Sequence, residues 1–175
     1  MSNFKYQINI NNYIKKIENF WQSQAGFTLI EILVVFAVTS VILISSMAAF
    51  SSYGRSQTFN STVADIQQAL NLLKSNSISY VKPSQCGPSQ ALDGYQFWYP
   101  VLGTYYRLSV RCGGTYYVLL RKDLPSGITF GPTATTTTFF KVSTGTIDSQ
   151  NTMTIQGYGN SKVITIDKTG VISVQ

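Results

Sequence analysis

The hydrophobic positions divide the chain into three stretches with different periods. Across residues 27–50 almost every position is apolar, and the run is long enough for a membrane-spanning helix. Across residues 55–79 the apolar positions recur every three or four residues, which is typical of a helix with one buried face. After Pro83 the period falls to two, in short runs separated by turn residues. We expect an α+β fold, in which a long N-terminal helix packs on an antiparallel β-sheet head like the stick and head of a lollipop.

Four segments follow from this pattern. They are a leader (1–26), a membrane-spanning helix (27–53), its amphipathic continuation (54–82) and a globular head (83–175). The buried stripe of the continuation is predicted to be Phe59, Val63, Ile66, Leu70 and Leu73. The predicted strands are 95–101, 104–111, 115–121, 128–130, 135–142, 152–156, 162–167 and 170–174, with a tight turn at 167–170.

Glu31 is the one formal charge in the apolar run. On insertion scales, a carboxylate at the centre of a membrane helix costs about 2.5–3.5 kcal/mol. Because such a group needs a partner, Glu31 is a candidate functional residue.

The composition favours an extracytoplasmic or assembling protein. The chain is 44% hydrophobic and 11% charged, against about 25% charged residues in soluble domains. The net charge of +6 falls to +4 without residues 1–26, because that segment holds three lysines and one glutamate. Lysines before the apolar run favour a cytoplasmic N-terminus. The remaining charge is a mild signal for a polyanionic partner.

The residue inventory argues against an enzyme. The chain has no histidine, which excludes Ser-His-Asp and Cys-His catalysis and the commonest zinc ligand sets. The acids are scattered, and there is no glycine-rich phosphate loop. We expect no catalytic residue, no cofactor and no metal.

The two cysteines, Cys86 and Cys112, follow the apolar run. If the lysines set the orientation, both lie on the oxidising side of the membrane, where a disulfide is expected. The bond would be worth about 3 kcal/mol in the chain-entropy model. Two buried free thiols are the alternative.

Three interpretations compete for the first 50 residues. A secretory signal peptide would use "SSMAAF" (residues 45–50) as its cleavage region, although the apolar run is longer than usual and carries a charge. A plain membrane anchor leaves Glu31 unexplained. The third interpretation starts from the string "GFTLIE" at residues 26–31.

This string resembles the prepilin signature of type IV pilins and type II secretion pseudopilins. The resemblance implies that a prepilin peptidase, which is also the methyltransferase, cleaves after Gly26 and that Phe27 becomes the methylated N-terminus. Glu31 would then pair with the N-terminal amine of a neighbouring subunit. The implied partners are other pilin or pseudopilin subunits and the inner-membrane assembly platform. The implied location is the cytoplasmic membrane, crossed once with the head outside, and later the pilus or pseudopilus.

The C-terminal half carries a second resemblance. The segments "LPSGITF" (124–130) and "KVITIDKTGVISV" (162–174) are similar to the heads of GspH/FimT-type minor pilins and pseudopilins. This resemblance implies a minor structural subunit.

One strand offers a possible nucleic-acid contact. Tyr105, Arg107 and Arg111 fall on one face of the strand at 104–111 by the period of two. Arginines among aromatic residues can hold DNA through stacking and phosphate contacts, whereas the simpler interpretation is a solvated sheet face. A DNA-binding minor pilin of a competence pilus is therefore the alternative function, and a membrane-anchored surface protein is the second alternative.

Overall fold

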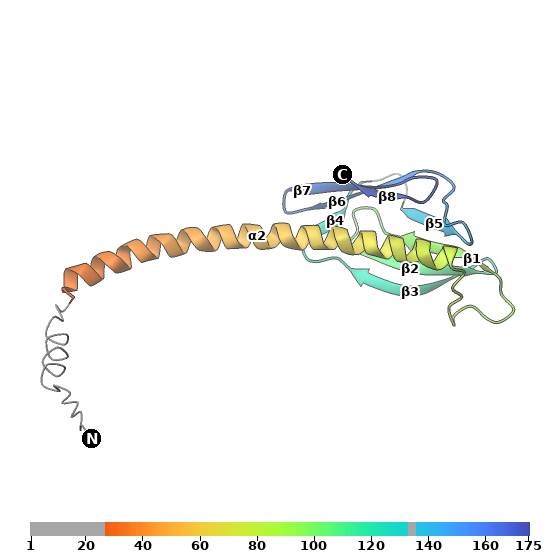
Figure 1. Cartoon of the computed structure of the whole chain (residues 1–175), viewed down its shortest axis with the longest axis horizontal. Helices are drawn as coiled ribbons and strands as arrows, with labels where there is room; N and C mark the ends of the chain where they lie inside the picture. Colours follow the sequence, from red (N-terminus) through yellow and green to blue (C-terminus); the bar gives the residue numbers. More distant parts are fainter. Residues whose placement is uncertain (1–26, 133–135) are drawn as a thin grey trace, which may run out of the picture. The chain divides into compact units, whose positions relative to one another are not determined.

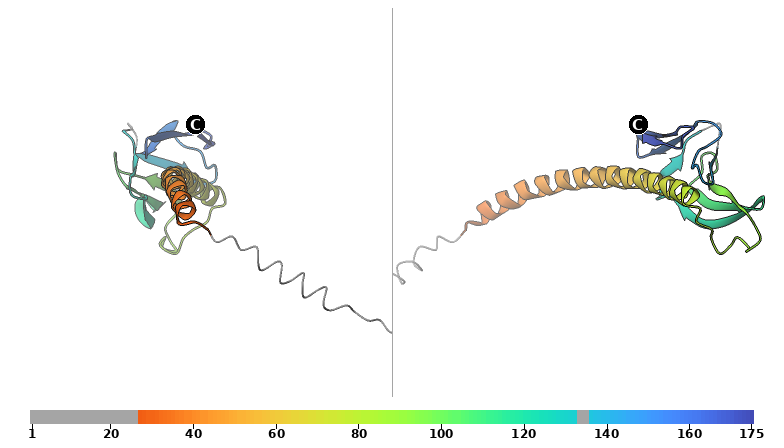
Figure 2. Two further views of the ribbon diagram at one scale, coloured as in Figure 1. Left: turned by 90° about the vertical axis from the view of Figure 1, so that its left-hand side faces the viewer. Right: turned by 45° about the vertical axis from the view of Figure 1, so that its right-hand side comes forward.

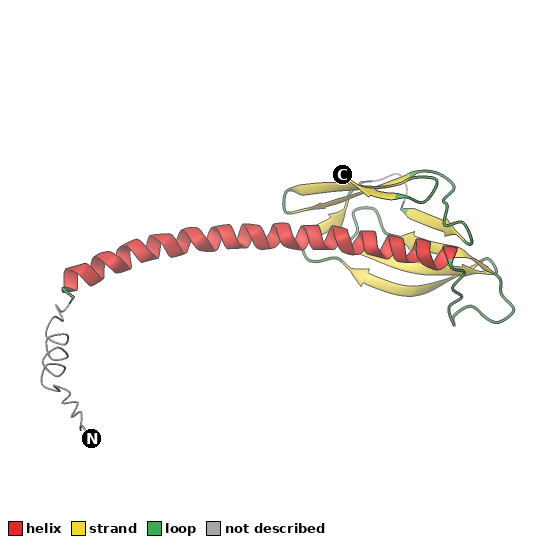
Figure 3. Ribbon diagram, in the orientation of Figure 1, coloured by secondary structure: helices red, strands yellow, loops and turns green. Residues whose placement is uncertain are grey.

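The computed structural model describes residues 27–132 and 136–175, apart from the side chains of Ser45, Ala48 and Ala49. In this part of the chain it contains one α-helix, labelled α2, and eight β-strands (Figures 1 and 3). The chain divides into two compact units at Ala48–Ala49, which are described separately. The predicted leader, residues 1–26, lies outside the described residues.

The N-terminal unit contains the first half of α2 (Leu29–Ile78). All the large apolar side chains described in this half are exposed, for example Phe36 at 70% and Ile44 at 72%. Its hydroxyl groups bond within the helix: the Thr39 and Ser46 side chains each donate to a carbonyl one turn back at 2.8 Å. This half therefore presents apolar surface on all sides.

The predicted membrane span at 27–53 is not confirmed. In the part of the chain that the structure describes, no helix combines the length and the apolarity needed to cross a bilayer.

The second half of α2 belongs to the head. The predicted stripe is confirmed, because all five of its residues are buried, with exposed fractions between 0% and 3%. The helix ends at Ile78, earlier than the predicted residue 82. Tyr80 adopts a left-handed conformation (φ 53°), and the Val81 N–H donates to the Asn76 carbonyl at 3.0 Å. This bonding pattern is a Schellman C-cap, which terminates the helix before Pro83.

Two four-stranded antiparallel sheets complete the head (Figure 1). The first sheet has the order β3-β2-β1-β5 and consists of β1 (Leu92–Trp98), β2 (Tyr105–Cys112), β3 (Thr115–Asp123) and β5 (Thr137–Lys141). The second has the order β4-β6-β7-β8 and consists of β4 (Ile128–Phe130), β6 (Asn151–Gly157), β7 (Asn160–Ile166) and β8 (Ile172–Val174).

The strand predictions agree with these elements to within a few residues. The turn at 167–170 is also confirmed, because the Gly170 N–H donates to the Asp167 carbonyl at 2.9 Å. The sequence did not show how the strands divide between the sheets: β4 joins the C-terminal strands, whereas β5 returns to pair with β1. This α+β arrangement agrees with the expected class.

The core lies where α2 and the two sheets meet (Figure 2). Aromatic rings fill it: Phe97 stacks on Tyr106 at 5.0 Å between ring centroids, and Tyr99 stacks on Phe130 at 4.3 Å. Because Tyr99 directly follows β1 of the first sheet and Phe130 lies in β4 of the second, the Tyr99–Phe130 contact joins the two sheets.

A polar contact ties β3, at the edge of the first sheet, to the helix. The Lys122 Nζ donates to Asp65 Oδ2 at 2.9 Å, and this hydrogen bond raises the pKa of Lys122 above its usual range. The contact links the last part of β3 to α2.

The predicted disulfide joins Cys86 to Cys112 across 26 positions of sequence. Both residues are buried, at 5% and 0% exposure. The bond fixes the loop that follows α2 to the end of β2.

Candidate functional site

The described part of the predicted assembly motif begins at Phe27, which is 75% exposed. Thr28 caps the helix: the Glu31 N–H donates to the Thr28 carbonyl at 3.1 Å and lies 3.3 Å from the Thr28 Oγ1. Glu31 is thus exposed in the first turn of α2. Gly26, the predicted cleavage position, lies outside the described residues.

Sequence reasoning missed the role of Thr28. The signal was present, since "TLIE" has the Thr-x-x-Glu spacing of a capping box, in which the first side chain accepts a bond from the fourth residue. A carboxylate in the first turn also interacts favourably with the helix dipole. Glu31 can therefore help to start the helix and still present an exposed carboxylate to a partner.

The second candidate site lies on the outer face of the first sheet and consists of Trp98, Tyr105, Arg107 and Arg121, here called the Tyr105 cluster. The Arg107 guanidinium lies 5.0 Å from the Trp98 ring centroid and 5.3 Å from that of Tyr105. The Arg121 guanidinium lies over the same Tyr105 ring at 4.0 Å. Strands β1, β2 and β3 together thus place rings and guanidinium groups side by side within cation–π distance.

Arg111 belongs to a separate group on the same face. Its guanidinium lies 5.4 Å from the Tyr116 ring centroid, and its Nε lies 3.6 Å from Asp93 Oδ2. The structure therefore brings together two of the three predicted contact residues, Tyr105 and Arg107, and places the third in its own ion pair.

Arg121 and Trp98 were missed because they lie on neighbouring strands. Arg107 on β2 has two register partners. Arg121 faces it from β3, and Trp98 faces it from β1. A shift in the β2–β3 register between Leu108 and Ser109 decides which β3 residue faces Arg107. Hydrophobic periodicity gives no sign of such a bulge.

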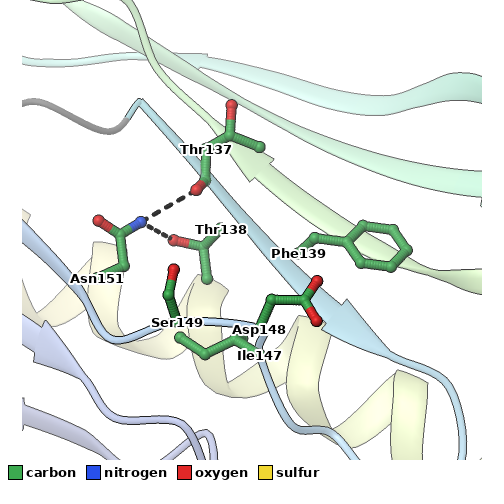
Figure 4. A pocket seen from close by; sticks show the side chains of 7 residues that line it. All are labelled: Thr137, Thr138, Phe139, Ile147, Asp148, Ser149 and Asn151. Atoms are coloured by element: carbon green, nitrogen blue, oxygen red, sulfur yellow. Dashed lines mark hydrogen bonds between the residues drawn. The ribbon is translucent and has the colours of Figure 1, made fainter.

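A small cavity of about 130 Å³ lies beside β5 (Figure 4). Asn151, which is 4% exposed, donates through its amide to the Thr137 carbonyl at 3.1 Å and to the Thr138 hydroxyl at 2.6 Å. The carboxylate at the cavity, Asp148, pairs with Lys141 at 2.5 Å. Among the described residues, no group of three or more Cys, Asp or Glu side chains is arranged to hold a metal ion.

Comparison with known proteins gives one family match. Residues 21–47 match the prokaryotic N-terminal methylation motif, which includes the string at 26–31 and the first part of α2. No curated protein and no solved structure matches the chain.

The match supports a type IV pilin-like protein with a prepilin signal. Such a signal implies processing by a prepilin peptidase and assembly with other pilins. The head lies outside the matched residues, so its resemblance to GspH/FimT proteins stays a prediction.

Proposed function

We propose that this protein is a structural subunit, processed by prepilin peptidase, of a type IV pilus or a type II secretion pseudopilus. The observation that carries the proposal is the methylation motif at residues 21–47, which ends within the apolar half of α2. Proteins with this motif are structural rather than catalytic.

The exposed surface of the first half of α2 supports this function. Large apolar side chains such as Leu33 and Val41, 58% and 65% exposed, face outward along the helix. Exposed apolar surface of this extent marks an interaction site. We therefore expect neighbouring subunits to bury these side chains in a filament. Lipid covers them before assembly.

Glu31 would set the register of that assembly. Cleavage after Gly26 leaves an amino group on Phe27 with a pKa near 7.7–8.0, mostly cationic at neutral pH, and methylation keeps the charge. This cation can neutralise the Glu31 carboxylate of a neighbouring subunit in a medium of low dielectric. Removing either partner leaves an uncompensated buried charge, so correctly placed subunits are favoured.

The assignment as a minor or a bulk subunit depends on the head. The GspH/FimT resemblance at 124–130 and 162–174 favours a minor component over a bulk subunit. We place the subunit in the cytoplasmic membrane, with the head in the periplasm or at the cell surface, because the lysines of the leader precede the apolar run.

The mass of the mature N-terminus tests this proposal. The full chain is co-expressed with a prepilin peptidase, alongside a Gly26→Ala control. A product that begins at methylated Phe27, absent from the control, is expected. An uncleaved native chain would indicate a membrane anchor instead, and cleavage after Ala48 would indicate an exported protein.

A further inference from the structure

Two arginines lie directly opposite each other on the exposed face of the head. Arg107 on β2 and Arg121 on β3 are register partners in the antiparallel sheet. Side chains in such a pair have Cβ atoms about 4.5–5.5 Å apart, and like charges there repel. Arginine side chains carry a positive charge throughout the physiological pH range. The arrangement therefore favours an anion between the two guanidinium groups.

The aromatic rings hold both arginines in place and use few of their donors, since the one hydrogen bond to a ring substituent is the long contact from Arg107 to the Tyr105 hydroxyl at 3.4 Å. Tyr105 contacts both guanidinium groups, at 5.3 and 4.0 Å, and Trp98 contacts Arg107 from β1. Stacking covers the flat face of a guanidinium, while its N–H groups remain at the edge. Two forks fixed in this way suit an oxyanion, because arginine binds phosphate and carboxylate oxygens bidentately.

The nearby carboxylates neutralise the two arginines only weakly. Among the described residues, Arg107 makes no ion pair, and its one side-chain hydrogen bond is a long contact of 3.4 Å to the Tyr105 hydroxyl. Arg121 contacts Asp123 at 3.4 Å, but these side chains are 53% and 72% exposed. An exposed pair of this kind is weak, so an incoming anion can replace it.

We propose that Arg107 and Arg121 form a phosphate-binding site that takes the backbone of a single nucleic-acid strand. Tyr105 and Trp98 position the two arginines. The site lies within the head and involves no residue of the assembly motif.

The rest of the face favours a nucleic-acid strand over an acidic polypeptide. Arg111 lies four residues further along β2, at about 13 Å given 3.3 Å per residue, and with its β3 register partner Tyr116 it continues the row of charge and ring. Bases stack on aromatic rings and on guanidinium planes, and phosphates recur along the strand. An acidic polypeptide would use the charges but would offer no base to the Tyr116 ring, which is 46% exposed.

Binding of labelled oligothymidine, about 16 nucleotides long, to the full chain in detergent tests the proposal. Fluorescence anisotropy is recorded between about 50 and 200 mM salt for the native chain, Arg107→Gln and Arg121→Gln. The matched control is Lys168→Gln, which removes the same charge from the exposed turn between β7 and β8. Arg107→Lys keeps the charge and removes the planar fork.

Each glutamine variant is expected to weaken binding by about tenfold, and the slope of log affinity against log salt falls by about 0.7 for each lost phosphate contact. Arg107→Lys gives an intermediate loss, and Lys168→Gln stays close to the native chain. Thermal unfolding of each variant shows whether its head is intact.

Three results would overturn the proposal. One is no binding by the native chain at low salt, and another is an equal loss in Lys168→Gln. The third is displacement of the oligothymidine by polyglutamate of equal charge as readily as by unlabelled strand, which would point to an acidic polypeptide. Because cleavage after Gly26 is measured separately, this proposal and the filament function fail independently.

Discussion

The Glu31 N–H lies within hydrogen-bonding distance of both the carbonyl and the hydroxyl oxygen of Thr28, at 3.1 and 3.3 Å. The residue proposed to pair with a neighbour thus also belongs to the cap that starts α2. Any test of the pairing must separate the charge of Glu31 from its place in the cap.

Glu31→Gln makes that separation, because glutamine also occupies this position of a capping box. We expect unchanged expression and cleavage but loss of most filaments, since an unpartnered buried charge costs about 3–5 kcal/mol. The measurement is the amount of filament sheared from cells. Thr28→Ala is the control: it weakens the cap by about 0.5–2 kcal/mol and keeps the charge, so filaments persist. Normal filament yield from Glu31→Gln would contradict the pairing.

Removal of the Cys86–Cys112 bond lowers the stability of the head. The chain-entropy model predicts a loss of about 3 kcal/mol for a loop of this length. Urea unfolding with and without a thiol reductant measures it. The double variant Cys86→Ser and Cys112→Ser should match the reduced native chain and no longer respond to reductant.

Two glycines with similar backbone angles predict different costs for alanine. Gly159 (φ 79°) has open space where a Cβ would lie, so Gly159→Ala costs about 1–2 kcal/mol from the left-handed backbone alone. At Gly170 (φ 77°) the Cβ would lie 2.2 Å from the Gly145 carbonyl oxygen. Gly170→Ala must therefore also move the neighbouring turn, and its denaturation midpoint should be clearly lower. Equal midpoints would contradict this packing.

We expect the hydrogen bonds to Asp167 to make the free energy of unfolding fall in acid. The Thr169 hydroxyl and the Val171 N–H donate to its carboxylate, and these bonds hold the pKa of Asp167 below its usual value of 3.8. A depressed folded-state pKa adds stability above pH 3.8, and this contribution is lost as the pH falls through the folded-state value.

Urea unfolding at pH 5 and near pH 3 measures this effect. Asp167→Asn should lower stability at pH 5 and reduce the difference between the two pH values. An unchanged pH response in Asp167→Asn would assign the acid sensitivity to other groups.

The elements followed from the sequence because each has a local cause. Alternating intervals of three and four placed Phe59, Ile66 and Leu73 on one helical face, and all three are buried. The period of two, with glycines between the runs, located most strands to within a few residues. The helix end was misplaced, since the left-handed conformation of Tyr80 is unusual for a residue other than glycine.

By itself the sequence predicted an α+β fold and a type IV pilin-like protein. These predictions rest on local features, namely the string at 26–31, the apolar run behind it and the change of period near Pro83. The tertiary structure alone decided that β5 returns to β1 and that Arg107 faces Arg121. Pairing between distant strands depends on register, and one bulged residue changes which side chains meet. The Tyr105 cluster therefore exists in the fold and in no single segment of the sequence.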